Sequence, residues 1–151
     1  MLDEPELVGH SAVSGPHTRF SNFKVPVENL LASPDSAVDL VKQSFGISAA
    51  MVGGMAVGIM RAAFDKALQF AKSDNRGGLV PIIQRQSVAD LLVKTKIKLD
   101  ASRLLTWKAL DSVQNGPGDE AAGLEACLQA KIFSSENAVK CVVRAMKIVG
   151  M

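Results

Sequence analysis

Apolar and small residues recur at alternating spacings of four and three across residues 82–114. This spacing places its members on one face of an α-helix, and it is typical of a helix packed nearly parallel to a neighbour. The members are Val88, Leu92, Thr95, Leu99, Ser102, Thr106, Ala109 and Val113. We therefore predict a long helix from about Ile82 to Gln114.

A second long helix is predicted over residues 34–73. Ser33 can cap its N-terminus, and Pro34 suits a first turn because its missing N–H would be unpaired there anyway. Asp35 suits the positive end of the helix dipole. The helix is expected to end at Asp74-Asn75-Arg76-Gly77-Gly78, whose glycines can adopt the left-handed conformation.

A third long helix is predicted over residues 119–149, after the break at Asn115-Gly116-Pro117-Gly118. It has two apolar faces, which is typical of a helix between neighbours. The small face comprises Cys127, Ala130, Ser134, Ala138, Cys141 and Ala145, and the large face comprises Leu124, Leu128, Ile132, Val139, Val142, Met146 and Val149.

Residues 1–34 are expected to be irregular or extended. Within them, residues 18–25 alternate polar and apolar side chains, which predicts a half-buried strand whose partners lie elsewhere. We therefore divide the chain into a lead at 1–34 and a helical-bundle domain at 35–151. Because there is no Tyr and aromatic residues make up only 5%, the composition favours an all-α antiparallel bundle over a sheet sandwich.

Composition also limits the partners. A net charge of +2 without a Lys/Arg run gives no reason to expect nucleic-acid binding. The uncharged stretch Ser44–Met60 approaches the length of a membrane span, but its glycines and serines favour a buried core helix. The acidic N-terminus does not match a signal peptide, so an intracellular location, cytoplasmic or in an organellar matrix, is expected.

The cysteines and histidines suggest no catalytic or metal site. Cys127 and Cys141 lie about four turns apart on one predicted helix, so they cannot form a disulfide with each other. Two unpaired thiols are expected in a reducing compartment, packed in the core. His10 and His17 are interpreted as turn or surface residues, and no metal ligand is predicted.

Arg76 is the most informative polar residue because it precedes Gly77 and Gly78 in a predicted bend. Guanidinium presents a planar fork of donors to phosphate oxygens, and glycine backbone allows a close approach. The alternative is an ordinary solvated arginine beside the end of a helix. The spacing alone leaves both interpretations open.

Several segments, in order, resemble the C-terminal part of the acyl-CoA dehydrogenase superfamily. They are Phe23 to Leu31, Arg61 to Gln86, Lys131 to Glu136 and Ala145 to Gly150. Three others are most similar to the nitroalkane oxidase branch: Ser14 to Phe20, Ala71 to Gly78 and Ser102 to Ala109. Arg76-Gly77-Gly78 departs from the Arg-x-x-Phe-Gly pattern of ordinary acyl-CoA dehydrogenases.

The resemblance implies a site for FAD between a middle domain and the C-terminal bundle of a tetramer. It assigns Arg76 and Gln86 to the diphosphate or adenosine region of the FAD of a neighbouring subunit. It assigns Phe45 and Ser48 to the lining of the substrate and flavin cavity.

The resemblance also implies a flavin-dependent oxidoreductase in which a carboxylate removes a carbon-bound proton and electrons pass to FAD. In the nitroalkane oxidase branch, oxygen then reoxidises the flavin. The carboxylate is expected beyond Met151, so no catalytic residue is nominated and this chain alone is expected to be inactive. The alternatives are an acyl-CoA dehydrogenase-like domain acting on CH–CH donors, or a noncatalytic helical oligomerisation module.

Overall fold

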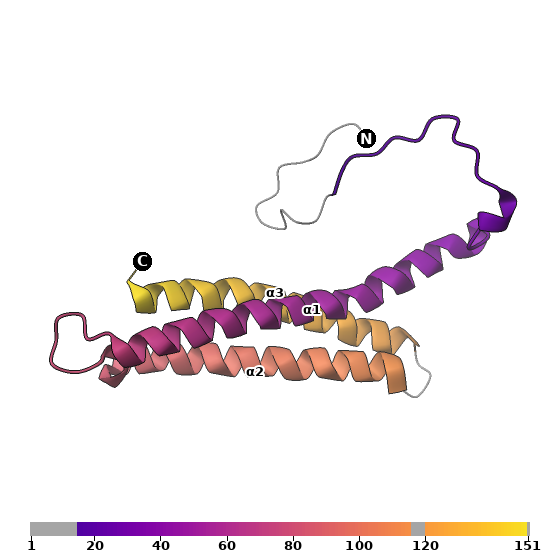
Figure 1. Cartoon of the computed structure of the whole chain (residues 1–151). Coiled ribbons are helices and arrows are strands. Elements are labelled where there is room, and N and C mark those ends of the chain that lie inside the picture. Colours follow the sequence, from indigo (N-terminus) through magenta and orange to yellow (C-terminus); the bar gives the residue numbers. More distant parts are fainter. Residues whose placement is uncertain (1–14, 116–119, 151) are drawn as a thin grey trace. The chain divides into compact units, whose positions relative to one another are not determined.

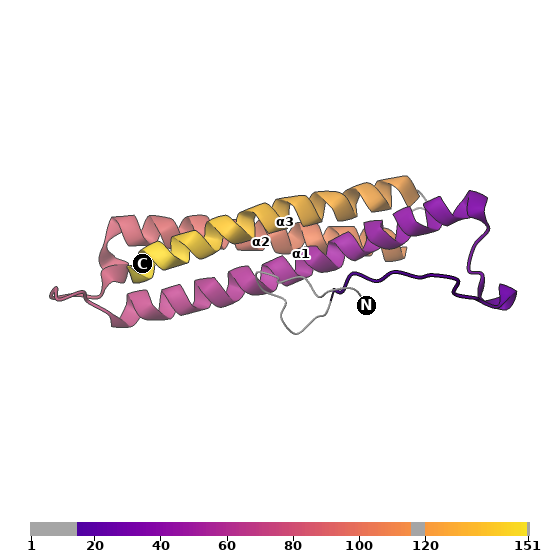
Figure 2. The same cartoon turned by 90° about the horizontal axis from the view of Figure 1, so that it is seen from above.

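The computed structural model describes residues 15–115 and 120–150 (Figures 1 and 2). Its elements, in order, are η1 (Val27–Asn29), α1 (Pro34–Ser73), η2 (Ile82–Gln84), α2 (Gln86–Asn115) and α3 (Glu120–Val149). No β-strand is formed within these described ranges. The predicted all-α class is therefore confirmed.

The chain divides into two compact units, residues 1–37 and 38–151. In the first unit, the strand predicted over residues 18–25 is not formed, and every residue of that stretch is exposed. Phe20 and Phe23 instead lie together, with their ring centroids 5.8 Å apart. The prediction was wrong because alternation alone does not make a strand, whose backbone groups need a neighbouring strand to pair with.

The second unit is built from three helices that share a core made of three clusters. The first joins Ala49 and Ala50 of α1 to Ala109 of α2 and to Cys127 and Ala130 of α3. The second joins Ala56 and Met60 to Leu99 and to Ala138 and Cys141. The third joins Ala67 and Ala71 to Leu92, Ile82 and Ile148.

The order of these clusters fixes the direction of each helix. From the first cluster to the third, residue numbers rise along α1 and α3 and fall along α2. The bundle is therefore up-down-up, with α2 antiparallel to both neighbours, as the two views show (Figures 1 and 2). This arrangement follows from two short connections between long helices.

The helices approach closely because their facing residues are small. A Cβ added to Gly46 would lie 2.4 Å from Cδ2 of Leu124, and one added to Gly53 would lie 3.0 Å from Oγ1 of Thr106. The predicted inner seam of α2 is buried from Leu92 to Ala109. Val88 at one end is half-buried, and Val113 at the other is exposed.

The outer faces of α1 and α3 differ from the sequence-based interpretation. Ser44–Met60 was expected to be a buried core segment, but only one of its faces is buried. The large face of α3 is only partly covered: Leu124 faces Gly46 of α1, whereas Leu128, Ile132, Val139 and Met146 are exposed. By length and composition alone, the segment Val27–Ser73 could cross a membrane, and 33% of its most apolar window is buried.

The helix boundaries match the prediction at α1 and differ at α2. Backbone N–H groups of Ser36 and Ala37 donate to the carbonyl of Ser33, so α1 starts where predicted. The α2 helix starts at Gln86 rather than Ile82, since η2 intervenes and Arg85 is extended at φ −81° and ψ 125°. The α3 helix begins at Glu120, and the predicted start at Asp119 lies outside the described residues.

Candidate functional site

The connection between α1 and α2 is a tight polar turn. Backbone N–H groups of Arg76 and Gly77 donate to side-chain oxygens of Asp74 (2.8 Å) and Asn75 (3.1 Å). The backbone N–H of Gly78 donates to the carbonyl of Asn75 at 2.9 Å. Arg76 has φ +49° and Gly77 has φ +73°, so the turn passes through the left-handed region and glycine relieves part of the strain.

The guanidinium of Arg76 is partnered on several sides. Its Nη2 donates to the carbonyl of Val149 at the end of α3. Its Nε lies 3.5 Å from Oδ1 of Asp74, and its Cζ lies 4.9 Å from the centroid of the Phe70 ring. The side chain nevertheless remains 42% exposed. Arg76 is therefore held by the chain while still accessible from solvent.

Gln86 and Arg85 begin α2 beside this turn. Nη2 of Arg85 donates to the carbonyl of Asn75 at 3.3 Å, which ties the start of α2 to the turn. Gln86 is exposed, and its Nε2 donates to Oδ1 of Asp90 at 2.8 Å. Arg76, Arg85 and Gln86 are thus donors on the same short connection.

Phe45 and Ser48 lie one turn apart on α1. Oγ of Ser48 donates to the carbonyl of Phe45 at 2.9 Å, and the Phe45 side chain is 74% exposed. At 1.5 Å per residue, about 40 Å of helix separates Ser48 from the turn that carries Arg76. The predicted site residues therefore form two groups, one in the N-terminal half of α1 and one just past its C-terminal end, and the chain does not bring them together.

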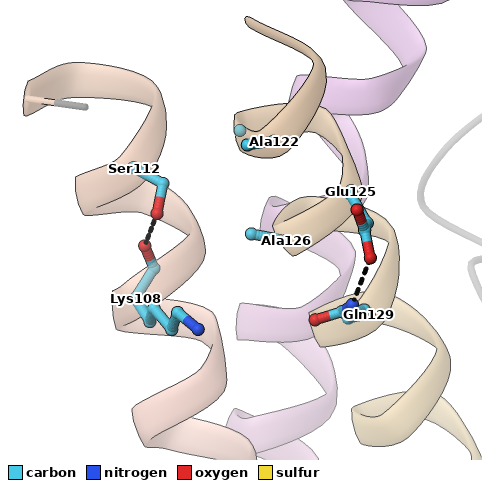
Figure 3. A pocket seen from close by; sticks show the side chains of 7 residues that line it. Lys108, Ser112, Ala122, Glu125, Ala126 and Gln129 are labelled. Carbon is cyan, nitrogen blue, oxygen red and sulfur yellow. Dashed lines mark hydrogen bonds between the residues drawn. The ribbon is translucent and has the colours of Figure 1, made fainter. Parts of the chain in front are cut away.

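A pocket of about 270 Å³ opens between α2 and α3 and was not predicted from the sequence (Figure 3). Ala122, Gly123 and Ala126 leave this space because their side chains are small. The two hydrogen bonds drawn there stay within single helices: Ser112 Oγ to the Lys108 carbonyl, and Gln129 Nε2 to Glu125 Oε1, each at 2.8 Å. No predicted site residue lines this pocket.

Among the residues that the structure describes, no group of three His, Cys, Asp or Glu side chains could hold a metal ion. Both cysteines are free and buried in the core. Burial raises the pKa of the Cys127 thiol. Burial also raises the pKa of Cys141, although nearby Arg144 and Lys98 oppose the shift. Neither thiol is therefore an activated nucleophile.

The carboxylates of the bundle also have partners within one helical turn. Asp65 pairs with Arg61, Asp100 with Lys96 and Arg103, and Glu136 with Lys140, at 2.6–3.9 Å. Asp111 accepts a hydrogen bond from Nδ2 of Asn115 at 2.9 Å. None of these side chains is arranged as a general base aimed into a cavity, because each faces its own helix surface.

Comparison with known proteins identifies the fold. Residues 38–151 match the family model described as acyl-CoA dehydrogenase, C-terminal domain. The chain is 53% identical to the nitroalkane oxidase of Fusarium oxysporum over 152 residues, which cover 100% of this chain and 35% of that protein. It is 27% identical to the mitochondrial short-chain specific acyl-CoA dehydrogenase of Mus musculus over 145 residues, which cover 96% of this chain and 34% of that protein.

A solved nitroalkane oxidase, an active-site mutant crystallized with 1-nitrooctane, superposes with a TM-score of 0.95 at 54% identity. The match covers 99% of this chain and 35% of that one. The chain therefore spans about a third of the length of these relatives. The resemblance found in the sequence is confirmed: this chain belongs to the family of acyl-CoA dehydrogenase C-terminal domains.

Proposed function

We propose that this chain is the C-terminal helical part of a flavin-dependent oxidoreductase that acts on nitroalkanes. The proposal rests on one contrast: identity is 53% to a nitroalkane oxidase and 27% to a short-chain acyl-CoA dehydrogenase, each over nearly the whole chain. Nitroalkane oxidases and acyl-CoA dehydrogenases share the family fold, so a shared fold does not explain why the identity to the first is so much higher. One solved nitroalkane oxidase is described as a flavoprotein, and another as a complex with the competitive inhibitor spermine.

In the proposed reaction a carboxylate removes a carbon-bound proton from the nitroalkane, and FAD supplies the electron acceptor. We assign that base to no carboxylate of this chain. The candidates considered are Asp65, Asp74, Asp90, Asp100, Asp111 and Asp119. Asp74 is already engaged with Arg76, and Asp90 accepts a hydrogen bond from Gln86.

We propose that Arg76 and Gln86 contact the diphosphate or adenosine part of FAD held by a neighbouring subunit. The residues present fit such a group. Arg76 offers a partly exposed guanidinium, Gly77 leaves the backbone beside it open, and Gln86 is exposed on the same connection. Cationic forks and glycine backbone are favourable partners of phosphate oxygens.

We propose that Phe45 and Ser48, in the N-terminal half of α1, line the cavity for substrate and flavin. The exposed Phe45 ring offers apolar surface, and Ser48 is half-buried beside it. One solved nitroalkane oxidase is an active-site mutant with serine changed to alanine, crystallized with 1-nitrohexane. That relative supports a serine near the reacting groups, and Ser48 is the serine of this chain that we assign to the role.

We further propose that residues 1–34 belong to the middle domain and its linker, and that residues 35–151 form the helical domain. The assembly is proposed to be a homo-oligomer, a tetramer as the family resemblance implies, in a cytoplasmic or organellar compartment. The exposed large side chains of α1 and α3 support an assembly, because contiguous apolar surface of this kind marks interaction sites.

A chimera tests the proposed function. This chain would replace the matching 35% of the Fusarium oxysporum enzyme, and nitrite release from nitroethane would be measured against dye reduction by butyryl-CoA. We expect nitrite release with bound flavin and no reaction with the thioester. A chimera that holds flavin and reduces dye only with butyryl-CoA contradicts the proposal. In the same chimera, Arg76→Ala is expected to weaken FAD retention.

A second candidate, an acyl-CoA dehydrogenase-like domain, is favoured by the family model that matches residues 38–151. A noncatalytic oligomerisation module is favoured by the exposed apolar faces. The chain by itself is expected to bind FAD weakly or not at all, which a flavin absorption spectrum of the purified protein measures. A colourless chain that gives an active chimera excludes the noncatalytic module.

A further inference from the structure

We propose that Arg76 is a positioning residue that clamps the C-terminal end of α3 to the α1–α2 connection. The clamp requires no cofactor, and it therefore goes beyond the proposed function. Three observations carry it: the partner of the guanidinium, the platform beneath it, and the space that Gly150 leaves for it.

The partner is the carbonyl of Val149, which accepts from Nη2 of Arg76. Val149 is the last residue of α3. The final four carbonyls of an α-helix lack an intrahelical donor, and the C-terminal end carries a partial negative charge. The guanidinium of Arg76 supplies the missing donor and places a positive charge at this negative end, although Arg76 is distant in sequence from α3.

The platform is formed by Phe70 and Asp74. The guanidinium carbon lies 4.9 Å from the Phe70 ring centroid, and Nε lies 3.5 Å from Oδ1 of Asp74. Phe70 packs against the third core cluster, which also contains the buried Ile148 beside Val149. Both sides of the clamp are thus anchored in the same cluster, so Arg76 connects two segments that the core already holds near each other.

Gly150 provides the space. It has φ +84°, and a Cβ added to it would lie 2.8 Å from Nη2 and 3.1 Å from Cζ of Arg76. No other residue type fits there without displacing the guanidinium, and no other adopts this φ without strain. Arg76 and Gly150 therefore form a matched pair across the end of α3.

The clamp has a consequence for the interpretation of Arg76 variants. Removing the side chain would remove both a proposed phosphate contact and the connection to Val149, so weaker FAD retention would have two explanations. Gly150→Ala separates them in part, because it leaves the Arg76 charge in place while it displaces the guanidinium, although it also strains the backbone at φ +84°.

Amide hydrogen exchange on the whole chain tests the clamp. Arg76→Ala is expected to speed exchange about tenfold in the last turn of α3, from Met146 to Gly150, because a charge-assisted hydrogen bond at a helix end is lost. Amides from Ala130 to Ala138, in the middle of α3, should be unchanged. Arg85→Ala is the matched control, since it removes a guanidinium from the same connection without touching α3.

Two further variants keep the test decisive. Gly150→Ala should also speed exchange in the last turn, and Arg76→Lys should restore part of the protection because it keeps the charge but not the fork. The clamp is overturned if the last turn exchanges at the wild-type rate in Arg76→Ala. It is equally overturned if Arg85→Ala has the same effect. A uniform rise in exchange along the whole of α3 in Arg76→Ala, Arg76→Lys and Gly150→Ala would also overturn it.

Discussion

The two faces of α1 are both apolar, yet only one is buried. The inner face, with Gly46, Ala49, Gly53 and Ala56, is buried against α2 and α3. The outer face carries larger and more hydrophobic side chains, and these are exposed: Val41, Phe45, Val52, Met55 and Ile59. Hydrophobicity would rank the faces in the opposite order. Residue size decides the packing here, because small side chains let three helix backbones approach closely.

The same contrast holds in α3. Its buried face is mostly small side chains, with Ile148 as the large exception near the C-terminal end, and most of its large apolar side chains are exposed. Within the bundle the core is therefore thin, and much of the apolar surface lies outside it. Since each core cluster joins all three helices, changes at the inner positions should cost far more stability than the same changes outside.

Two methionines of α1 provide the largest test of this contrast. Met60 is 0% exposed and Met55 is 50% exposed. Met60→Ala should lower the free energy of unfolding by about 3 kcal/mol, because it leaves a cavity in the second core cluster. Met55→Ala should change it by less than about 0.5 kcal/mol. Urea unfolding followed by circular dichroism measures both, and equal losses would contradict the division of α1 into two faces.

Adjacent glycines give the next largest effect. Gly53→Leu should destabilise by about 2 kcal/mol, because its Cβ would already lie 3.0 Å from Thr106 and the rest of the side chain has no space. Nothing lies within 4 Å of a Cβ on Gly54. Gly54→Ala should therefore stabilise by about 0.5 kcal/mol through helix propensity. If both glycines tolerate substitution alike, close approach at Gly53 is not required.

A pair of neighbouring residues on α3 sharpens the contrast further. Ala138→Leu should cost about 1.5 kcal/mol through overpacking of the second core cluster. Val139, which is 66% exposed, serves as the control, and Val139→Leu should have little effect. Thermal unfolding measures both variants. If Ala138→Leu unfolds at the same temperature as the wild type, the small face of α3 is not tightly packed.

The smallest effect concerns the buried thiols. Burial raises the pKa of Cys127 and Cys141 above the ordinary value of 9.0, so the folded state keeps protons that the unfolded state releases. Stability from these groups is complete below pH 9.0 and falls as pH rises towards the folded-state pKa values. Between pH 8 and pH 10, urea unfolding should show that the free energy of unfolding declines. The decline should be smaller in the double variant with Cys127→Ala and Cys141→Ala. An identical decline in that variant would exclude the thiols as its cause.

Much of the bundle could be predicted because its signals are local. The limits of α1 follow from Ser33, Pro34 and the glycines after Arg76, and the seam of α2 follows from its own spacing. The strand over residues 18–25 could not be judged in the same way, because strands depend on partners that local alternation does not reveal. The delayed start of α2 was missed because Pro81 leads into a single 3-10 turn before Gln86.

The proposed site residues divide in the same manner. A glycine-rich turn around Arg76 was visible in the sequence, since left-handed backbone requires such residues. The contact between Arg76 and Val149 was not visible, because it joins residues that are separated by two helices. The pocket between Lys108 and Gln129 was also missed, because it depends on which small residues of two helices face each other.

The sequence by itself determined that this chain forms three long helices, where they end, and which family they belong to, because periodicity, capping residues and family motifs are all written along the chain. Only the tertiary structure decided which of two apolar faces would be buried, and what Arg76 would hold. Those outcomes depend on how closely helix backbones can approach, and that distance is set jointly by side chains on different helices.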